Sequence, residues 1–392
     1  MKLLVVCEFR FMRTPDGKTW TTSAFAHGFW ERYLVVFDEV LVVARVNQAE
    51  RKDPQWVRAD GEKVTISALP YYVGLAGLLG NLFKLRGISR QHSQHADAIL
   101  FRVPSQTAML TIPCHGFGSK GYALEVVGDP ADVFAAGITN RWLDKVLGWA
   151  SASMLRYMVK RAHSVSYVTQ AYLQGKYPAR MSCTVGHYSS IELPDDWFAP
   201  LPRKYLKPAT RILFIGSFGQ LYKGQDVLIR AIARLKSQGV TLNLTMLGGG
   251  VYLQPMRQLA ADLGIENQVM FVGEVKAASV REYLNAAEVF VMPSRTEGLP
   301  RALIEAMATA LPAIGTFAGG IPELLPPERL YPAEDIDMLA QKLVELCTDL
   351  HALNADSARN LQAAADYRKD TLVHRRTRFY QSVAENSRKL EK

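Results

Sequence analysis

The stretch "VFVMPSRTEGLPRALIEAMATALPAIGTFAGGIPE", residues 289–323, joins two short apolar runs through a segment of helical character. Pro300 has a fixed φ and no N–H to donate, so it suits the first turn of a helix. Leu303, Ile304 and Met307 then recur at helical spacing and form one apolar stripe. A strand, a helix and a second strand in this order are the repeating unit of a parallel sheet.

The same alternation runs along the whole chain. Strands are expected at 2–7, 38–46, 64–68, 98–102, 122–127, 164–169 and 181–185, and then at 211–216, 242–248, 269–273, 289–294 and 313–317. The stretch 192–210 has four prolines and no clean period, so it is interpreted as a linker. We therefore predict an α/β protein with two Rossmann-like domains of doubly wound parallel sheets, at 1–200 and 201–372. The charged segment 373–392 is expected to be a helix that packs back on the first domain.

The bulk composition agrees with this division. A chain of 392 residues is too long for one ordinary core. Its net charge of +9 fits either an anionic partner or a merely basic solvated surface. The four cysteines lie far apart without metal-ligand spacing, which favours a reducing, cytoplasmic compartment. The apolar stretch 69–83 falls short of the ~20 residues that span a bilayer.

Two glutamates mark the first candidate site. Glu297 stands before the Gly-Leu-Pro helix opening, and Glu305 follows it after seven residues, beside the apolar stripe. A partly buried carboxylate is costly without donors, so Glu305 needs a partner. A pyrophosphate on the free N–H groups of Gly298 and Leu299 would bring a ribose near Glu305. The alternative is that Glu297 caps the helix while Glu305 pairs with Arg301 at i,i+4.

Two further loops follow expected strands. Gly216 ends the run 211–216 and Ser217 follows it, and Lys223 with Gly224 opens a helix. This arrangement resembles a phosphate-binding loop, although it lacks the Walker A order. Gly249 lies among three glycines, 248–250, after the next strand. A solvated lysine in an ordinary βα turn and a purely structural glycine turn are the alternatives.

Together, "FIGSFGQLYKG" (214–224) and "EGLPRALIEAMA" (297–308) resemble the retaining GT-B glycosyltransferases of family 4, also called glycosyl transferases group 1. The hallmark of that family is a pair of glutamates seven residues apart, followed by Ala-Met-Ala and later by Gly-Gly-x-x-Glu. The matching positions are Glu297, Gly298, Glu305, Ala306, Met307, Ala308, Gly319, Gly320 and Glu323. The resemblance spans the second half of the chain, and the first half agrees in architecture only.

The resemblance implies a GT-B fold with two facing domains, a deep cleft between them and a nucleotide diphosphate sugar as donor. Lys223, Gly298 and Leu299 would bind the diphosphate, Glu305 the ribose, and Glu297 the transferred sugar near its anomeric carbon. The other donor-binding candidates are Gly216, Ser217, Gly249 and Arg295. Ser217 replaces the family's usual basic residue, so phosphate binding is expected to depend more on Lys223, or on Arg295 or Arg301.

In the first domain the family's usual histidine is missing, and Asp129 is expected to take its place as a catalytic residue. Acceptor-binding candidates are Asp16, Gly17 and His27. The implied reaction transfers a sugar with retention, without a metal or cofactor, to a carbohydrate or lipid-linked acceptor in cell-surface polysaccharide or glycolipid synthesis. The alternatives are a catalytically silent partner that binds nucleotide sugar, and an epimerase of the same fold.

Three further expectations concern partners and metals. Nucleic acid is disfavoured, since basic residues do not cluster with aromatic ones. The apolar and basic stretches 69–86 and 140–161 suggest docking on an anionic membrane surface, although a buried helix with a solvated face fits 140–161 equally. No metal site is expected, and Asp335 and Asp337 of "EDID" (334–337) are interpreted as helix-capping residues.

Overall fold

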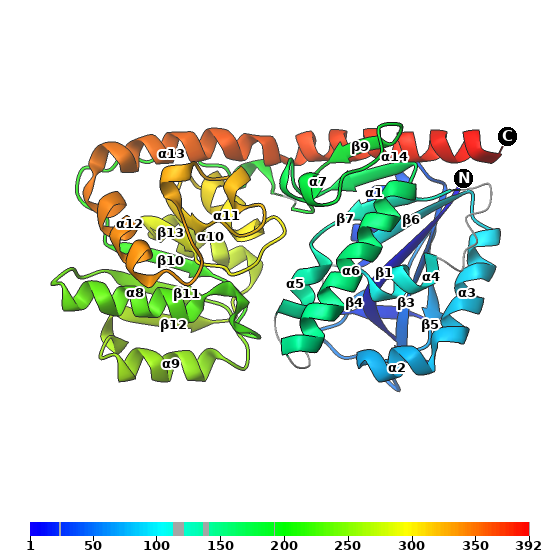
Figure 1. The fold of residues 1–392 in the computed structure, drawn as a ribbon, viewed down its shortest axis with the longest axis horizontal. Helices are drawn as coiled ribbons and strands as arrows, with labels where there is room; N and C mark the ends of the chain where they lie inside the picture. Colours follow the sequence, from blue (N-terminus) through cyan, green and yellow to red (C-terminus); the bar gives the residue numbers. More distant parts are fainter. Residues whose placement is uncertain (23–24, 113–120, 136–140, 192, 392) are drawn as a thin grey trace. The chain divides into compact units, whose positions relative to one another are not determined.

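The computed structural model describes residues 1–392 apart from 23–24, 113–120, 136–140, 192 and 392. The chain forms two compact units: unit 1 contains Met1–Tyr188 and Val373–Lys392, and unit 2 contains Ser189–Leu372. Each unit has its own sheet and helices (Figure 1). The chain returns from unit 2 to unit 1 within one long helix, α14 (Lys369–Glu391).

Unit 1 is built around a sheet in which the described residues form nine strands. Strand β1 lies between β3 and β6, and the parallel ladder continues from β6 through β7 and β8 to β9. Only β2 runs antiparallel, to β1 and to β4, and forms a short ribbon at the end of β1. The strands are β1 (Lys2–Arg13), β2 (Thr19–Thr21), β3 (Glu39–Gln48), β4 (Val57–Arg58), β5 (Val64–Leu69), β6 (Ala98–Val103), β7 (Ala123–Val126), β8 (Ser164–Tyr167) and β9 (Thr184–His187).

Helices pack on this sheet through apolar stripes, and α14 adds a buried polar contact. The hydroxyl of Tyr380 on α14 donates to the carboxylate of Glu125 on β7, 2.9 Å away, and both residues are buried. Arg102 of β6 also donates to Glu125, at 2.7 Å, so the buried charge is compensated. The helices are α1 (His27–Leu34), α2 (Gly74–Gly80), α3 (Leu82–Gln94), α4 (Gln106–Thr111), α5 (Pro130–Ala135), α6 (Arg141–Arg161) and α7 (Tyr172–Lys176).

Unit 2 contains a six-stranded, fully parallel sheet in the order β12-β11-β10-β13-β14-β15. Its strands are β10 (Arg211–Ile215), β11 (Asn243–Leu247), β12 (Val269–Gly273), β13 (Val289–Met292), β14 (Ala313–Thr316) and β15 (Leu330–Tyr331). Its helices are α8 (Gln225–Ser237), α9 (Leu253–Asp262), α10 (Ala277–Ala286), α11 (Arg301–Ala308), α12 (Ile336–Thr348) and α13 (Leu350–Ala364). Short 3-10 turns interrupt the loops, among them η3 (Leu221–Lys223).

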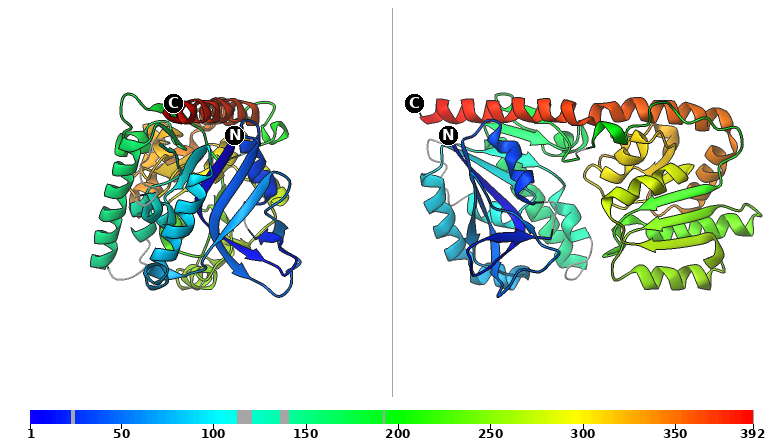
Figure 2. Two further views of the ribbon diagram at one scale, coloured as in Figure 1. Left: turned by 90° about the vertical axis from the view of Figure 1, so that its right-hand side faces the viewer. Right: turned by 180° about the vertical axis from the view of Figure 1, so that it is seen from behind.

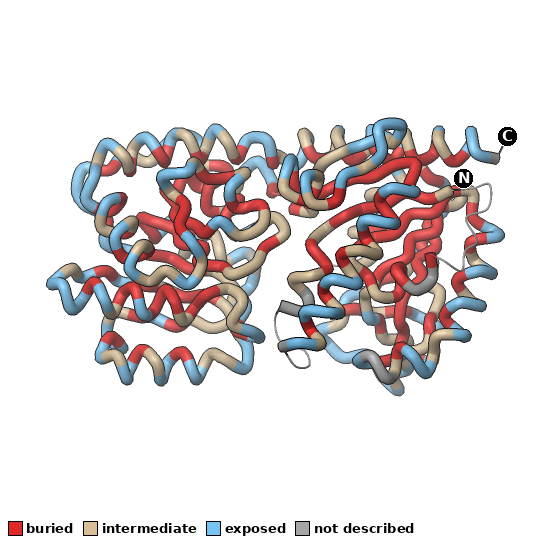
Figure 3. The backbone as a smooth tube through the Cα atoms, in the orientation of Figure 1, coloured by how far each residue is buried: buried red, intermediate tan, exposed pale blue. Residues whose placement is uncertain are grey.

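Both faces of the unit 2 sheet are covered, which makes it doubly wound. Val289 and Val291 share one buried cluster with residues of α8 and α12. Phe290 and Met292 alternate with them on the strand, so they point to the opposite face, and they are also fully buried. In each unit helices lie against the sheet (Figure 2). The central strands are mostly buried, whereas the covering helices alternate between buried and exposed residues (Figure 3).

The stretch interpreted as a linker is fastened to unit 2. The guanidinium group of Arg203 donates to the main-chain carbonyls of Leu284, Ala287 and Thr309 at 2.6–2.8 Å. The N–H of Ala199 donates to the carbonyl of Ala308 at 2.8 Å. Proline content indicated irregular structure correctly, but it carried no information on these distant carbonyl partners.

Candidate functional site

Three loops meet at the carboxyl edge of the unit 2 sheet, where open parallel sheets bind ligands. Glycines allow this approach, because each has a positive φ and no space for a side chain. A Cβ on Gly224 would lie 2.0 Å from the carbonyl oxygen of Pro293, and one on Gly248 would lie 1.9 Å from that of Gly216. The loops after β10, β11 and β13 are therefore packed backbone to backbone.

The turn after β14 joins the same cluster. A Cβ on Gly319, at φ 56°, would lie 1.7 Å from the carbonyl oxygen of Glu297. The N–H of Gly320 donates to the carbonyl of Gly298 at 2.8 Å. The two glycines thus hold the Glu297 loop in place, and the positive φ and close approach explain why glycine is needed at position 319.

Lys223 and Glu297 lie in direct contact in this cluster. The Nζ atom of Lys223 is 2.6 Å from Oε1 of Glu297, and Ser294 Oγ donates to the same oxygen at 2.7 Å. Glu297 is buried, with only 8% of its surface exposed. Helix α11 is capped by Pro300 without a side-chain hydrogen bond, so Glu297 does not cap it. Its second carboxylate oxygen accepts no hydrogen bond from the residues that the structure describes.

Glu305 is half-buried on α11, and no hydrogen bond or ion pair holds its carboxylate within the described part of the chain. The alternative pairing with Arg301 at i,i+4 is not formed. Desolvation raises the pKa of the Glu305 carboxyl above its ordinary value, and the distant charge of Arg301 opposes that shift only in part. A buried carboxylate needs hydrogen-bond donors, and none of the described residues supplies one to Glu305.

The N–H groups of Gly298 and Leu299 also lack a hydrogen-bond partner among the described residues. They lie between Glu297 and the start of α11, where main-chain N–H groups and the helix dipole favour an anion. The ammonium group of Lys223 lies in the same loop cluster and would add a positive charge near an anion bound at this point.

Arg295 is placed differently from its sequence-based role. Its guanidinium group makes a two-pronged contact with the carboxylate of Asp226 at 2.8 and 2.9 Å, and a second one with Glu334. It also donates to the carbonyl of Leu221, and its N–H donates to that of Tyr222 at 2.7 Å. Hydrogen bonds to Asp226, above all, raise the pKa of Arg295. The structure therefore gives Arg295 the role of tethering η3, and with it Lys223.

The loop 216–220 is held by hydrogen bonds from a buried residue that the sequence patterns did not reveal. Gln225 is fully buried, and its Nε2 donates to the carbonyls of Ser217 and Gln220 at 2.8 and 3.1 Å. Ser217 is exposed, and its hydroxyl accepts from the N–H of Gly219 at 3.0 Å. Gly249 lies across this loop, because its carbonyl accepts from the N–H of Phe218. A glutamine at a helix start has no sequence signature that would have marked it.

In unit 1, both carboxylate oxygens of Asp129 are engaged. Oδ1 accepts from the hydroxyl of Tyr177 at 2.6 Å and from the N–H of Ala131 at 2.9 Å, and Oδ2 is paired with Lys176. Asp129 is almost fully buried at the start of α5. This geometry gives Asp129 a structural role, and its catalytic role stays a prediction.

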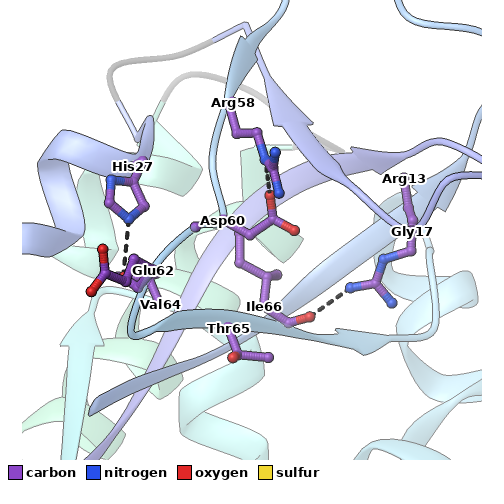
Figure 4. Close-up of a pocket in the computed structure, with 10 residues that line it drawn as sticks. Arg13, Gly17, His27, Arg58, Asp60, Glu62, Val64, Thr65 and Ile66 are labelled. Atoms are coloured by element: carbon purple, nitrogen blue, oxygen red, sulfur yellow. Dashed lines mark hydrogen bonds and ion pairs between the residues drawn. The ribbon is translucent and has the colours of Figure 1, made fainter. Parts of the chain in front are cut away.

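Of the acceptor candidates, Gly17 and His27 line one hollow of unit 1, with a volume of about 790 Å³ (Figure 4). Asp16 does not line it and is exposed to solvent. A hydrogen bond from Thr14 lowers the pKa of Asp16 to about 2, together with contacts from Lys18. The residues of the hollow come from the end of β1, the start of α1 and the segment from β4 to β5.

Asp335 of the segment 334–337 caps α12 as expected, since its side chain accepts from the N–H of Met338. Asp337 lies in the first turn of α12 and pairs with Arg234 at 3.1 Å instead of capping the helix. Residue 140 of the stretch 140–161 and the side chain of Arg141 lie outside the described part. In that part, no helix is both long and apolar enough to cross a membrane.

Two units of this kind, each with helices around a mainly parallel sheet, are the architecture of the glycosyltransferases of the GT-B fold. Sucrose-phosphate synthase from Thermosynechococcus elongatus superposes with a TM-score of 0.69 over 97% of this chain and 98% of its own, at 15% identity. Anabaena Alr3699/HepE in complex with UDP-glucose superposes with a TM-score of 0.64 over 96% and 98%, at 16% identity.

The family model of the glycosyl transferases group 1 matches residues 209–349 of this chain. It is 27% identical to protein CapJ of Staphylococcus aureus over 87% of this chain and 85% of CapJ. It is 38% identical to the putative colanic acid biosynthesis glycosyltransferase WcaL of Escherichia coli, over 37% and 38%. It is 32% identical to the GDP-mannose-dependent alpha-(1-6)-phosphatidylinositol monomannoside mannosyltransferase of Mycobacterium tuberculosis, over 38% and 42%.

Proposed function

We propose that this glycosyltransferase moves a sugar from a nucleotide diphosphate sugar to a carbohydrate or lipid-linked acceptor, with retention at the anomeric carbon, in cell-surface polysaccharide or glycolipid synthesis. The observation that carries the proposal is the loop cluster of unit 2. In this cluster Lys223 contacts the buried Glu297, and two N–H groups beside them lack partners among the described residues. Within the same described part, the Glu305 carboxylate on the following helix α11 also has no partner.

In this proposal each group has a defined task. Lys223 and the N–H groups of Gly298 and Leu299 bind the diphosphate, whose negative charge grows as it leaves the sugar. Fixed dipoles and a fixed charge stabilise that growth without reorganisation. Glu305 accepts both ribose hydroxyls, which supply the donors that its burial requires. The unbonded oxygen of Glu297 faces the transferred sugar, where positive charge develops.

The printed names of relatives supply the first donors to test. The Mycobacterium relative is named as GDP-mannose-dependent, and HepE was solved with UDP-glucose. We expect one nucleotide sugar among GDP-mannose, UDP-glucose and UDP-galactose to raise the melting temperature, since a ligand of the folded state stabilises it. Release of the nucleoside diphosphate, with a product whose anomeric proton coupling shows retention, would support the function. Nucleotide-sugar binding without any transfer to a panel of acceptors would favour a silent partner, and interconversion of the sugar would favour an epimerase.

Docking on an anionic membrane is the second part of the proposal. Phe83 on α3 is 86% exposed, and Trp142 and Trp149, seven residues apart on one face of α6, are 72% and 71% exposed. Exposed basic residues accompany them: Lys84, Arg86 and Arg90 on α3, and Lys145, Arg156 and Lys160 on α6. Aromatic and basic side chains on a helix whose other face is buried are typical of interfacial binding.

Co-sedimentation with vesicles tests this part. Vesicles containing phosphatidylglycerol should bind the protein more tightly than neutral phosphatidylcholine vesicles, and salt should weaken binding, because each basic side chain adds about 1 kcal/mol near an anionic surface. Trp142→Ser with Trp149→Ser should reduce binding, whereas Val185→Ser, also at an exposed apolar residue, should not. Equal binding to both vesicles would contradict the role of the basic residues, and no binding to either would favour a soluble acceptor.

A further inference from the structure

The hollow of unit 1 has a polar lining of unusual charge arrangement. Arg13 of β1 is half-buried there, and its Nη2 atom donates to the carbonyl of Ile66 at 2.6 Å. Its Nε and Nη2 atoms also contact Thr19 Oγ1 at 3.3 Å. None of these partners is charged, and within the described ranges no carboxylate forms an ion pair with Arg13. Its positive charge is therefore uncompensated, and its Nη1 atom has no hydrogen-bond partner there.

A second guanidinium group faces the same hollow. Arg58 of β4 contacts Asp60 Oδ1 through Nε at 2.8 Å, and the other oxygen of Asp60 accepts from the N–H of Thr19 at 3.1 Å. Both carboxylate oxygens of Asp60 are thus used, while the two terminal nitrogens of Arg58 have no partner in the described structure. Free N–H groups from two arginines are the donors that carboxylate and phosphate groups bind best.

The other end of the hollow offers groups that suit neutral hydroxyls. His27 and Glu62 lie together there, away from Arg13 (Figure 4). His27 Nε2 is 3.3 Å from the carbonyl oxygen of Glu62, and His27 Nδ1 is 3.4 Å from Oε1 of Glu31. The Glu62 carboxylate is unpaired among the described groups. A side chain on Gly61 would bring Cβ to 2.5 Å from the His27 ring, so glycine keeps the ring in place.

We infer that this hollow binds a saccharide that carries an anionic group, with a carboxylate or phosphate on Arg13 and Arg58 and sugar hydroxyls on His27 and Glu62. Its volume of about 790 Å³ falls in the range of small-molecule sites. The inference rests on the proposed function, because it assigns the ligand as the acceptor. It adds that the acceptor is acidic and names the residues that recognise its charge.

Titration calorimetry at low salt with D-glucuronate, D-glucose 6-phosphate and D-glucose tests the site. We expect either anionic sugar to bind at least about tenfold more tightly than glucose, because one charge-assisted hydrogen bond contributes about that much affinity. Comparison of glucuronate with the phosphate separates the two possible anionic groups. Equal affinity for all three sugars, or no binding of either anion, would overturn the inference.

The variant Arg13→Met keeps the length of the side chain and removes its charge. It should weaken binding of the anionic sugars about tenfold and leave the affinity for glucose unchanged, whereas Arg230→Met, at an exposed arginine of α8, should change neither. If melting curves show that Arg13→Met is unfolded, Arg58→Met applies the same test. Gly61→Ala should weaken the binding of all three sugars, because the added methyl group displaces the His27 ring. If a folded Arg13 or Arg58 variant binds the anionic sugars with unchanged affinity, the assignment of these arginines to the anionic group is wrong.

Binding of nucleoside diphosphates to the same preparations separates this inference from the proposed function. If anionic sugars bind through Arg13 while no nucleotide sugar binds, the hollow is a saccharide site and the proposed donor function fails. If sugar transfer proceeds equally well to neutral and acidic acceptors and does not change in Arg13→Met, the proposed function stands and the acidic-acceptor assignment is wrong.

Discussion

The ammonium nitrogen of Lys223 lies 2.6 Å from a carboxylate oxygen of Glu297, and these side chains are only 17% and 7% exposed. They come from η3 and from the loop after β13, two segments separated by three α-helices, three strands and their connections. In the proposed function one binds the diphosphate and the other faces the sugar. Removal of either partner therefore disturbs the same ion pair, but the kinetic consequences should differ.

Replacement of Lys223 should act on binding. We expect Lys223→Ala to weaken nucleoside diphosphate binding by roughly 10–100-fold, the loss of a charge-assisted bond of ~1.5–3 kcal/mol. Lys207→Ala, at an exposed lysine of the same unit, is the control and should have no effect. Calorimetric titration showing wild-type affinity in a folded Lys223→Ala protein would remove Lys223 from the donor site.

Replacement of Glu297 should act on turnover. Glu297→Ala releases Lys223 from its carboxylate partner, so affinity for the free nucleoside diphosphate should stay equal or rise, while kcat falls about 100-fold or more. Ser294→Ala removes one donor to the carboxylate and should give a smaller fall in kcat. If Glu297 is only a structural residue, melting temperature will drop and kcat per folded molecule will remain close to that of the wild type.

Glu305 should discriminate between ligands with and without a ribose. We expect Glu305→Gln to weaken binding of the nucleoside diphosphate about tenfold and to leave inorganic pyrophosphate unaffected, because a neutral amide accepts hydroxyls less strongly than a carboxylate. Both affinities can be measured by calorimetry on one preparation. An equal loss for both ligands would mean that the start of α11 itself is damaged.

The same residue predicts a pH dependence of stability. Burial raises the pKa of Glu305 in the folded protein above its ordinary 4.5, so the folded state holds this proton more tightly than the unfolded chain. The resulting stabilisation is complete below pH 4.5 and is lost as pH rises through the folded pKa.

Glu305→Gln cannot ionise, so its advantage over the wild type in free energy of unfolding should grow as pH rises from 4.5 towards neutrality. Urea unfolding at a series of pH values measures this difference, and Glu282→Gln, at an exposed glutamate, should show none of it. A stability difference that does not change with pH would contradict the assignment of a raised pKa.

Arg295 provides a test of tethering against direct binding. Asp226→Asn should weaken nucleoside diphosphate binding by about three- to tenfold, because it loosens the hold of Arg295 on η3 and on Lys223. If Arg295 contacted the diphosphate directly, removal of the negative charge of Asp226 would free its guanidinium group and strengthen binding. The direction of the change in affinity therefore decides between the two roles, and Arg295→Lys should weaken binding in the same way as Asp226→Asn.

Local periodicity determined much of this protein. The five strands expected in the second half correspond to β10, β11, β12, β13 and β14, and the apolar stripe of 301–308 predicted α11 with Glu305 half-buried on it. Strands and helices can be predicted in this way because their apolar side chains alternate, or recur every three to four residues, within one element. The short strands β2, β4 and β15, of two or three residues each, have too few residues to show a period.

The partners of the charged side chains were decided only by the tertiary structure. Arg295 and Lys223 are both basic residues next to expected strand ends, and the sequence analysis predicted the same role, diphosphate binding, for both. In the folded chain the guanidinium group reaches Asp226 and Glu334, whereas the ammonium group reaches Glu297. The hollow of unit 1 likewise joins Arg13, Arg58 and Ile66 from three different strands. The spacing of residues along a strand or helix is set within one element, but the partner of a charge is chosen among loops that the sheet brings together from distant parts of the chain.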